Sequence, residues 1–136
     1  MDITLHKKHN TIHFQPEVIQ MFADIVEADE STRKILLFIG KMEKQRKTDN
    51  SSFKGITIKE IVENVEVERK TKIGKKQNSK YEVTKTNLHR KTAEHQIDKL
   101  SDMSLLFHES IKPYKLLFLT GRGWQVIEEL IKRKQK

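Results

Sequence analysis

Residues 55–65 read GITIKEIVENV. Thr57 and Glu60 form a T-x-x-E capping box, in which each side chain binds a backbone N–H that is free at the start of a helix. The apolar residues that follow recur at helical spacing, at Ile58, Ile61, Val62 and Val65. The sequence therefore predicts a short strand at Gly55, followed by a capped helix with one buried face.

A second helix is predicted from about Asn87, because helical spacing returns in HRKTAEHQIDKLSDMSLL at residues 89–106. One face of this helix is apolar, with Leu88, Ala93, Ile97 and Leu100. The opposite face is polar, with Arg90, Lys91, Glu94, His95 and Asp98. The apolar face fixes such a helix on a core, and the polar face stays available to a partner.

Downstream, the sequence predicts a hairpin and a last helix. Residues 105–107 and 114–119 are apolar runs typical of strands, and Pro113 fits the turn between them. Thr120 is a suitable N-cap for a helix with apolar residues at Trp124, Ile127, Leu130 and Ile131. Cations at 132–134 complement the dipole at the end of that helix.

Upstream, two helices are predicted. The first begins at Pro16 and ends near residues 27–29. Asp29 or Ser31 caps the second, which is apolar around much of its circumference and is expected to be the most buried helix. We expect it to end in the polar loop KQRKTDNSS at residues 44–52. Residues 1–15 have no helical period and predict an extended or partly ordered arm.

Residues 66–85 are rich in lysine. The chain has a formal net charge of +8, and nearly all of the excess lies in residues 67–91 and in the tail KRKQK at 132–136. Gly74 and Asn78-Ser79 are turn signals, and the residues on either side of them could pair as a small hairpin. A basic segment favours a polyanionic partner. A solvated, disordered loop is the alternative.

The predicted order of strand, capped helix, turn, helix, hairpin and helix resembles the winged helix-turn-helix DNA-binding proteins, including MarR-like and PadR-like regulators. GITIKEIV at 55–62 resembles the entry into the family's first DNA-supporting helix, and residues 89–106 resemble its recognition helix. LTGRG at 119–123 is similar to the L-T-x-x-G that often follows the wing. There are two departures: Ser104 stands where the family often has glycine, and the two helices have a longer connection than usual.

The resemblance implies an α+β, mainly helical fold. It implies a winged-helix DNA-binding domain at residues 30–120 with a basic insertion at 66–85, and its DNA-reading half lies at Thr57–Thr120. Residues 1–29 would then form an N-terminal arm and helix, and residues 121–136 a C-terminal helix and basic tail.

The resemblance also implies that the helix after His89 lies in the major groove. Arg90 is the best candidate for reading a base, because a guanidinium binds guanine at two atoms. Other cations and polar groups would contact phosphates, which position a protein without reading sequence. The full candidate set is Arg69, Lys70, Lys72, Lys75, Lys76, Lys80, Lys85, Thr86, His89, Arg90, Lys91, Glu94, His95 and Lys112. An ordinary solvated helix face is the alternative.

Sequence-specific binding of double-stranded DNA by a cytoplasmic transcription regulator is therefore the expected function. The helices at 16–28 and 121–134 predict a homodimer, because a small domain cannot easily bury both of their apolar faces. A compact monomer, in which residues 16–28 fold back onto the last helix of the same chain, is the alternative. The alternatives are a plasmid or phage replication or partition protein, and a winged-helix module that binds other proteins. No effector pocket is evident from the sequence.

Other classes of function find little support. The chain has no cysteine, which removes disulfides and thiolate chemistry. No paired carboxylates or Ser/His/Asp set indicates an enzyme, and the three histidines at 6, 9 and 13 lie in a segment without helical character, so no metal or cofactor is expected. No apolar run approaches the ~18–20 residues that span a bilayer. The start MDITLHKKHN lacks the apolar core of a secretory signal, so no membrane partner is expected.

Overall fold

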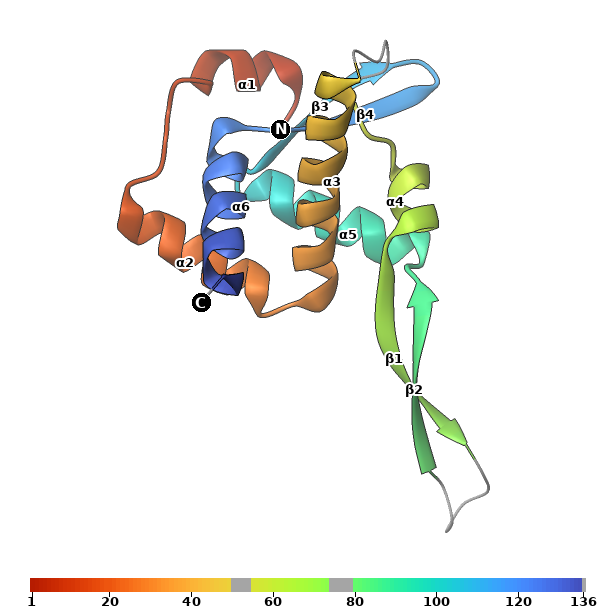
Figure 1. The fold of residues 1–136 in the computed structure, drawn as a ribbon. Helices are drawn as coiled ribbons and strands as arrows, with labels where there is room; N and C mark the ends of the chain where they lie inside the picture. The colour runs from red at the N-terminus through yellow and green to blue at the C-terminus, as the bar shows by residue number, and fades with distance from the viewer. Residues whose placement is uncertain (50–54, 74–79, 136) are drawn as a thin grey trace.

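The computed structural model describes residues 1–49, 55–73 and 80–135 (Figure 1). In these ranges the chain is an α+β fold, mostly helical, with two separate two-stranded antiparallel sheets. The elements are α1 Ile3–His9, α2 Pro16–Glu27, α3 Glu30–Thr48, α4 Ile58–Asn64, β1 Glu66–Ile73, β2 Lys80–Asn87, α5 Arg90–Asp102, β3 Leu106–Ile111, β4 Tyr114–Leu119 and α6 Gly121–Lys134.

The predicted helix starts are confirmed at three caps. Asp29 accepts hydrogen bonds from the backbone N–H groups of Ser31 and Thr32. Thr57 and Glu60 form both halves of the capping box. Thr120 accepts from the N–H of Gly123 at 3.0 Å. These side chains satisfy donors that a helix leaves unpaired in its first turn, and so they fix where each helix begins.

The prediction of an extended arm at residues 1–15 is wrong for residues 3–9, which form α1. Asp2 caps this helix by accepting from the N–H of Leu5 at 2.9 Å. The imidazole of His6 stacks on the ring of Phe107 with 3.7 Å between ring centroids, and the N–H of His108 donates to the carbonyl of Met1. These contacts with β3 stabilise a helix that is too short to be stable alone.

The predicted polar loop after the second helix begins too early, because α3 continues through residues 44–48. Arg46 binds the carbonyl of Gly55 and the carboxylate of Glu60, and the ammonium of Lys44 lies 5.6 Å from the centre of the Trp124 ring. These polar side chains therefore have partners elsewhere in the fold, and the helical backbone of α3 brings Lys44 and Arg46 within reach of those partners. Residues 50–52 of the predicted loop lie outside the described residues.

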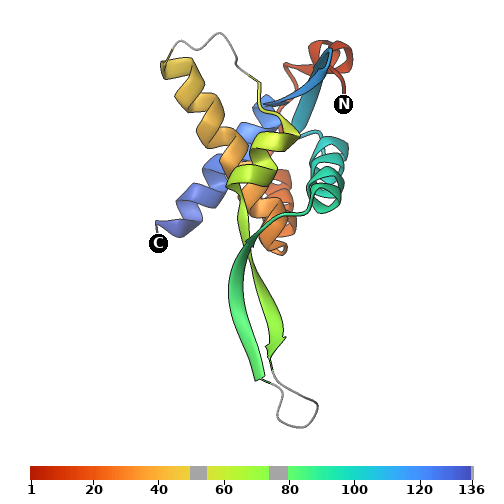
Figure 2. The same ribbon diagram turned by 90° about the vertical axis from the view of Figure 1, so that its right-hand side faces the viewer.

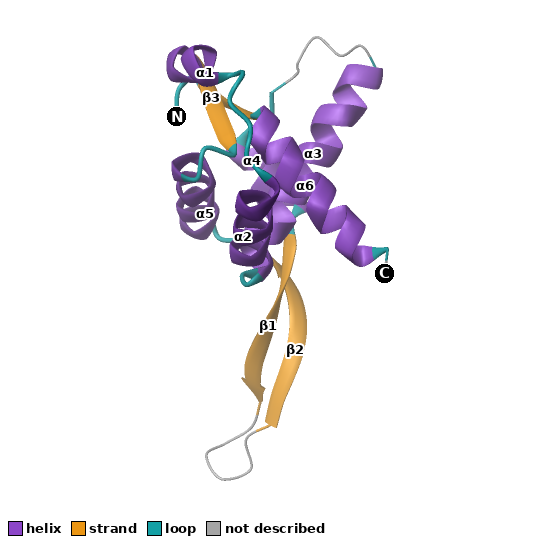
Figure 3. Ribbon diagram, turned by 90° about the vertical axis from the view of Figure 1, so that its left-hand side faces the viewer, coloured by secondary structure: helices purple, strands orange, loops and turns teal. Residues whose placement is uncertain are grey.

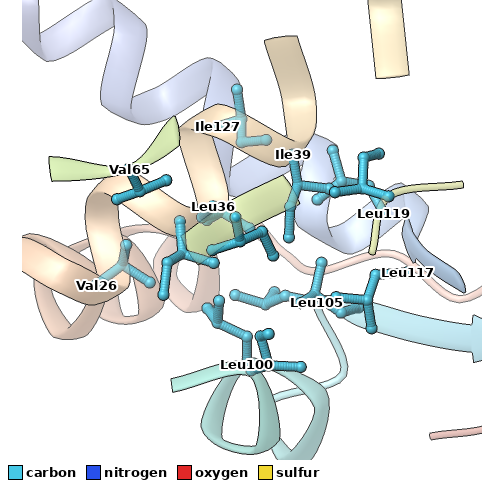
Figure 4. Packing of buried hydrophobic residues seen from close by; sticks show 14 of the residues in the cluster. Val26, Leu36, Ile39, Val65, Leu100, Leu105, Leu117, Leu119 and Ile127 are labelled. Atoms are coloured by element: carbon cyan, nitrogen blue, oxygen red, sulfur yellow. The ribbon is translucent and has the colours of Figure 1, made fainter. Parts of the chain in front are cut away.

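The core surrounds α3, which packs against α2, α4, α5, α6 and β4 (Figure 4). Ile35, Leu36 and Ile39 on this helix are completely buried. The expectation that it is the most buried helix is only partly met, since α6 buries five residues, as many as α3 does. The predicted apolar face of α5 is confirmed, because Ala93, Ile97 and Leu100 are all buried.

Helices α2 and α6 pack against each other within one chain (Figure 3). Ala23 and Val26 of α2 are buried, and so are Val126 and Ile127 of α6. Arg133 holds the polar edge of this contact with ion pairs to Asp24, Glu27 and Glu129 at 2.7–3.3 Å. The expectation that a small domain cannot bury both apolar faces is met only in part, since Ile25 and Ile131 stay exposed, and the homodimer stays a prediction.

Candidate nucleic-acid interface

Helix α5 presents the polar face that the sequence predicts. His89, Arg90, Lys91, His95 and Asp98 are exposed, and Glu94 is half-buried. The helix is fixed on α3 through a polar contact, because the buried hydroxyl of Thr32 donates to the side-chain carbonyl of Gln96 at 2.6 Å. Its polar face is therefore held in one orientation by both apolar and hydrogen-bonded contacts.

Three elements meet around Arg90 at the start of α5. An open groove of about 370 Å³ is lined by Thr57, Ile58 and Lys59 from the start of α4, by Arg90, and by Pro113, Tyr114 and Lys115 from the β3–β4 turn. A second hollow beside it, of about 360 Å³, is lined by Ile58, Arg90, Glu94, Ile97, Asp98 and Lys115. Residues from three parts of the sequence therefore form one continuous surface.

The sequence-based set includes Arg90 and Glu94 from this surface but misses Lys59, Tyr114 and Lys115. Lys112, which it does include, is exposed at the tip of the same turn. The antiparallel register pairs Ile111 with Tyr114 and Ser110 with Lys115. The predicted hairpin therefore places Tyr114 and Lys115 directly after its turn. The approach of this turn to α4 is a tertiary contact that no local sequence pattern shows.

Arg90 is oriented by its neighbour one turn along the helix. Its Nε lies 3.2 Å from a carboxylate oxygen of Glu94, and the two side chains are 67% and 46% exposed. Such an exposed pair contributes little to stability. The pair does hold the guanidinium at its Nε edge, and the two terminal nitrogens have no hydrogen-bond partner among the described residues. The edge that can bind two acceptors at once is thus left available.

The end of α5 is fixed by the segment LTGRG. Ser104 adopts a positive φ of 64°, and the N–H of Leu105 donates to the carbonyl of Leu100 at 3.0 Å. This is a left-handed helix end, where glycine is usual, and Ser104 occupies the position at which the resembled family often has glycine. The hydroxyl of Thr120 donates to the carbonyl of Ser104 at 2.7 Å.

Two further residues of LTGRG explain why the segment is close-packed. A Cβ on Gly123 would lie 2.3 Å from the carbonyl oxygen of Leu105, so the backbones approach more closely than any side chain allows. Arg122 is buried and donates to the carbonyls of His9 and Ile12 as well as to the hydroxyl of Ser104. The sequence does not indicate this role of Arg122, because His9 and Ile12 lie more than a hundred residues away in the chain.

The basic insertion forms the hairpin β1–β2, as predicted, with eight residues in each strand. Arg69, Lys70, Lys72 and Lys80 lie in its paired strands, whereas Lys75 and Lys76 lie outside the described residues. Lys85 is exposed, and its backbone pairs with that of Glu68. Thr86 pairs with Val67 at the root of the hairpin. Its hydroxyl is buried without a hydrogen-bond partner in the described structure, so Thr86 is not among the exposed candidate residues.

The two hairpins lie on opposite sides of the start of α5 (Figures 1 and 2). β1–β2 projects away from the helical body, and β2 leads through Leu88 and His89 into α5. β3–β4 extends on the other side, and Leu117 of β4 exchanges backbone hydrogen bonds of 3.1 and 2.8 Å with Ile56. The predicted strand at Gly55 is therefore a single bridge to this hairpin.

The described part of the chain was also compared with the requirements of a metal site and of a membrane-spanning helix, and it meets neither. No group of three or more His, Asp or Glu side chains that could hold a metal ion occurs among those residues. None of the described helices is long and apolar enough to cross a membrane. In comparisons with known proteins, no family model, no curated protein and no solved structure matches the chain.

Proposed function

We propose that this chain is a sequence-specific double-stranded-DNA-binding protein of the winged helix-turn-helix type, and not an enzyme. The observation that carries the proposal is the surface around Arg90, where the exposed start of α5 meets the start of α4 and the β3–β4 turn. A helix with a fixed apolar face and an exposed polar face can enter the major groove with its first turns.

The order of elements supports the winged-helix assignment. Helices α3, α4 and α5 occur in the order of the family's three helices, and the β3–β4 hairpin follows as the wing. The Ile56–Leu117 bridge adds the short strand that precedes the family's second helix. The hairpin β1–β2 between α4 and α5 is the departure from the pattern.

In this proposal the residues divide into two roles. Arg90 reads a base, because its unpartnered guanidinium edge matches the two acceptors of guanine. Lys59, Lys91 and Lys115 are exposed around it and bind phosphates, which set the position of α5 on the duplex. The cations of β1–β2 contribute by releasing counterions, so the affinity they give depends strongly on salt.

We further propose that the DNA-binding activity serves transcription regulation in the cytoplasm. A plasmid or phage replication or partition role is the second candidate, and the packing of α2 on α6 within one chain favours it. This packing covers part of the apolar surface of α2 and α6, while Met21, Ile25 and Ile131 stay exposed, and independent copies would suit directly repeated sites. A winged-helix module for protein partners accounts less well for the basic hairpin.

A binding selection on random duplexes tests the proposal. We expect a short consensus to be enriched at moderate salt by the full chain. A palindromic consensus would support a dimeric regulator, and a single or directly repeated one would support the replication or partition role. If the recovered duplexes stay random while binding is retained, the chain binds DNA without reading it. If no duplex is retained, the proposal is wrong.

A further inference from the structure

The β1–β2 hairpin is attached to the helical body only at its root in the contacts that the structure describes. The ammonium of Lys34 donates to the carbonyl of Glu66 at 2.9 Å, and the N–H of Glu68 donates to the carboxylate of Glu30 at 2.8 Å. Glu30 and Lys34 also pair with each other at 3.4 Å. Val67 is buried between these contacts. The first turns of α3 therefore fix the direction in which the hairpin leaves the body.

The hairpin is long on the scale of a DNA duplex. From Glu66 to Ile73, β1 spans about 23 Å at a rise of roughly 3.3 Å per residue. One turn of the duplex is about 34 Å. The part of the ribbon that the structure describes thus reaches about two-thirds of a turn from its root.

The charges change sign along the ribbon. Acidic residues in β1 occur only at Glu66 and Glu68, where the backbone binds α3, and the next two residues are Arg69 and Lys70. Lys72, Lys80 and Lys85 follow, against the single acid Glu82. Because Lys85 pairs with Glu68 at the root, the root carries a net charge of −1, and the described residues beyond it, 69–73 and 80–84, carry a net charge of +3. This distribution suits a polyanion that lies beyond the helical body.

We propose that β1–β2 is a second DNA-binding arm, which lengthens the binding site on the side of α5 opposite the β3–β4 hairpin. This inference rests on the proposed function. The two hairpins lie on opposite sides of the start of α5 (Figures 1 and 2), so a duplex that lies across the surface around Arg90 meets both of them. A two-stranded ribbon can enter a major groove or follow the backbone. One chain then covers more than one turn of DNA without a second copy.

The test shortens the ribbon and leaves its root intact. Residues 70–83 are replaced by Asn-Gly, which joins Arg69 to Thr84, a pair in the antiparallel register. Asn-Gly suits a two-residue turn. Hydroxyl-radical footprints on a selected duplex are compared for the full chain and the shortened variant. The variant removes about 13 Å of the described ribbon at roughly 3.3 Å per residue, so we expect it to lose about 4 base pairs of protection on one side only, at ~3.4 Å per base pair, and to keep the same consensus.

A charge-matched pair of variants separates the arm from general electrostatics. Lys70→Gln with Lys72→Gln should lower the slope of log affinity against log salt and weaken the one-sided protection. Lys132→Gln with Lys134→Gln removes the same charge at the end of α6 and should leave the protection unchanged. Circular dichroism and thermal melting check that each variant folds.

Two outcomes would overturn the arm. If the folded, shortened variant binds with an unchanged footprint, the arm is wrong while the proposed function stands. If the two charge variants behave alike, the hairpin has no special contact with DNA. Failure of the full chain to bind any duplex instead overturns the proposed function and the arm together.

Discussion

Three local features determine how Arg90 is presented on the candidate interface. It is the first residue of α5, it lies one turn before its partner Glu94, and it lines the same groove as Lys59 and Lys115. A guanidinium held at Nε presents its other nitrogens in a fixed fork, which gives more discrimination between bases than a mobile cation does. The side chain is therefore suited to reading a base, whereas the lysines around it are suited to phosphates.

Arg90→Ala should weaken binding to a selected duplex by about 1–3 kcal/mol and relax the preference at one base. The fold should be unchanged, because the Arg90–Glu94 pair is exposed. Titrations of the specific duplex and a random duplex measure the effect, with Lys132→Ala as the control of equal charge. Equal losses on both duplexes would make Arg90 a phosphate contact. No loss on either would remove it from the interface.

The segment LTGRG at residues 119–123 is predicted as a family motif, but the contacts that its residues make appear only in the structure. Thr120 binds the backbone at the end of α5, and Gly123 allows the carbonyl of Leu105 to approach. The same segment buries Arg122 against the loop after α1. Long-range backbone contacts of this kind leave no periodicity in the sequence.

At the scale of elements, local signals predict helix starts well and helix ends less well. Asp29, Thr57 and Thr120 bind backbone groups within a few residues, so their effect can be read from the sequence. The end of α3 and the whole of α1 depend instead on distant partners, Glu60 for Arg46 and Phe107 for His6. The sequence indicates the hairpin of residues 66–87 only through its turn signals, because its strands have no alternating apolar pattern.

The docking of α1 on β3 should weaken in acid. Burial, and then the nearby positive charge of Arg122, lower the pKa of His6 below its usual value of about 6.5. Burial also lowers the pKa of His108 in the strand beneath it. The unfolded chain takes up these protons first as the pH falls. The stability is therefore complete above about pH 6.5 and is lost as the pH falls through the lowered values.

His6→Phe tests this dependence, because it keeps the ring stacked on Phe107 and removes the titrating group. The Nδ1 atom of His6 is buried without a hydrogen-bond partner in the described structure, so its removal should not destabilise the chain. We expect the variant to melt at least as high as the natural sequence at pH 7.5, and to lose less of its melting temperature by pH 5.5. Identical pH profiles would show that His6 does not titrate on unfolding.

For the molecule as a whole, the sequence predicts the fold class and, from Pro16 onward, the order of elements, because each capped or amphipathic segment there can be recognised from its own residues. It does not predict how the elements pair. The dimer interpretation treated α2 and α6 as two exposed faces, but Arg133, Asp24 and Glu27 join them within one chain. Likewise, the meeting of α4, α5 and the β3–β4 turn around Arg90 follows from packing on α3. Complementary segments that are far apart in sequence give no sign that they fit each other.

The proposed function requires the surface around Arg90, and not the face formed by α2 and α6, to contact DNA. Backbone amide chemical shifts of the full chain, recorded as a selected duplex is added, test it most directly. We predict shifts concentrated at His89–Glu94, at Lys59 and at the β3–β4 turn from Lys112 to Lys115, with the exposed residues of α2 and α6 unaffected. Shifts concentrated on α2 and α6, or none at all at saturating duplex, would contradict the claim.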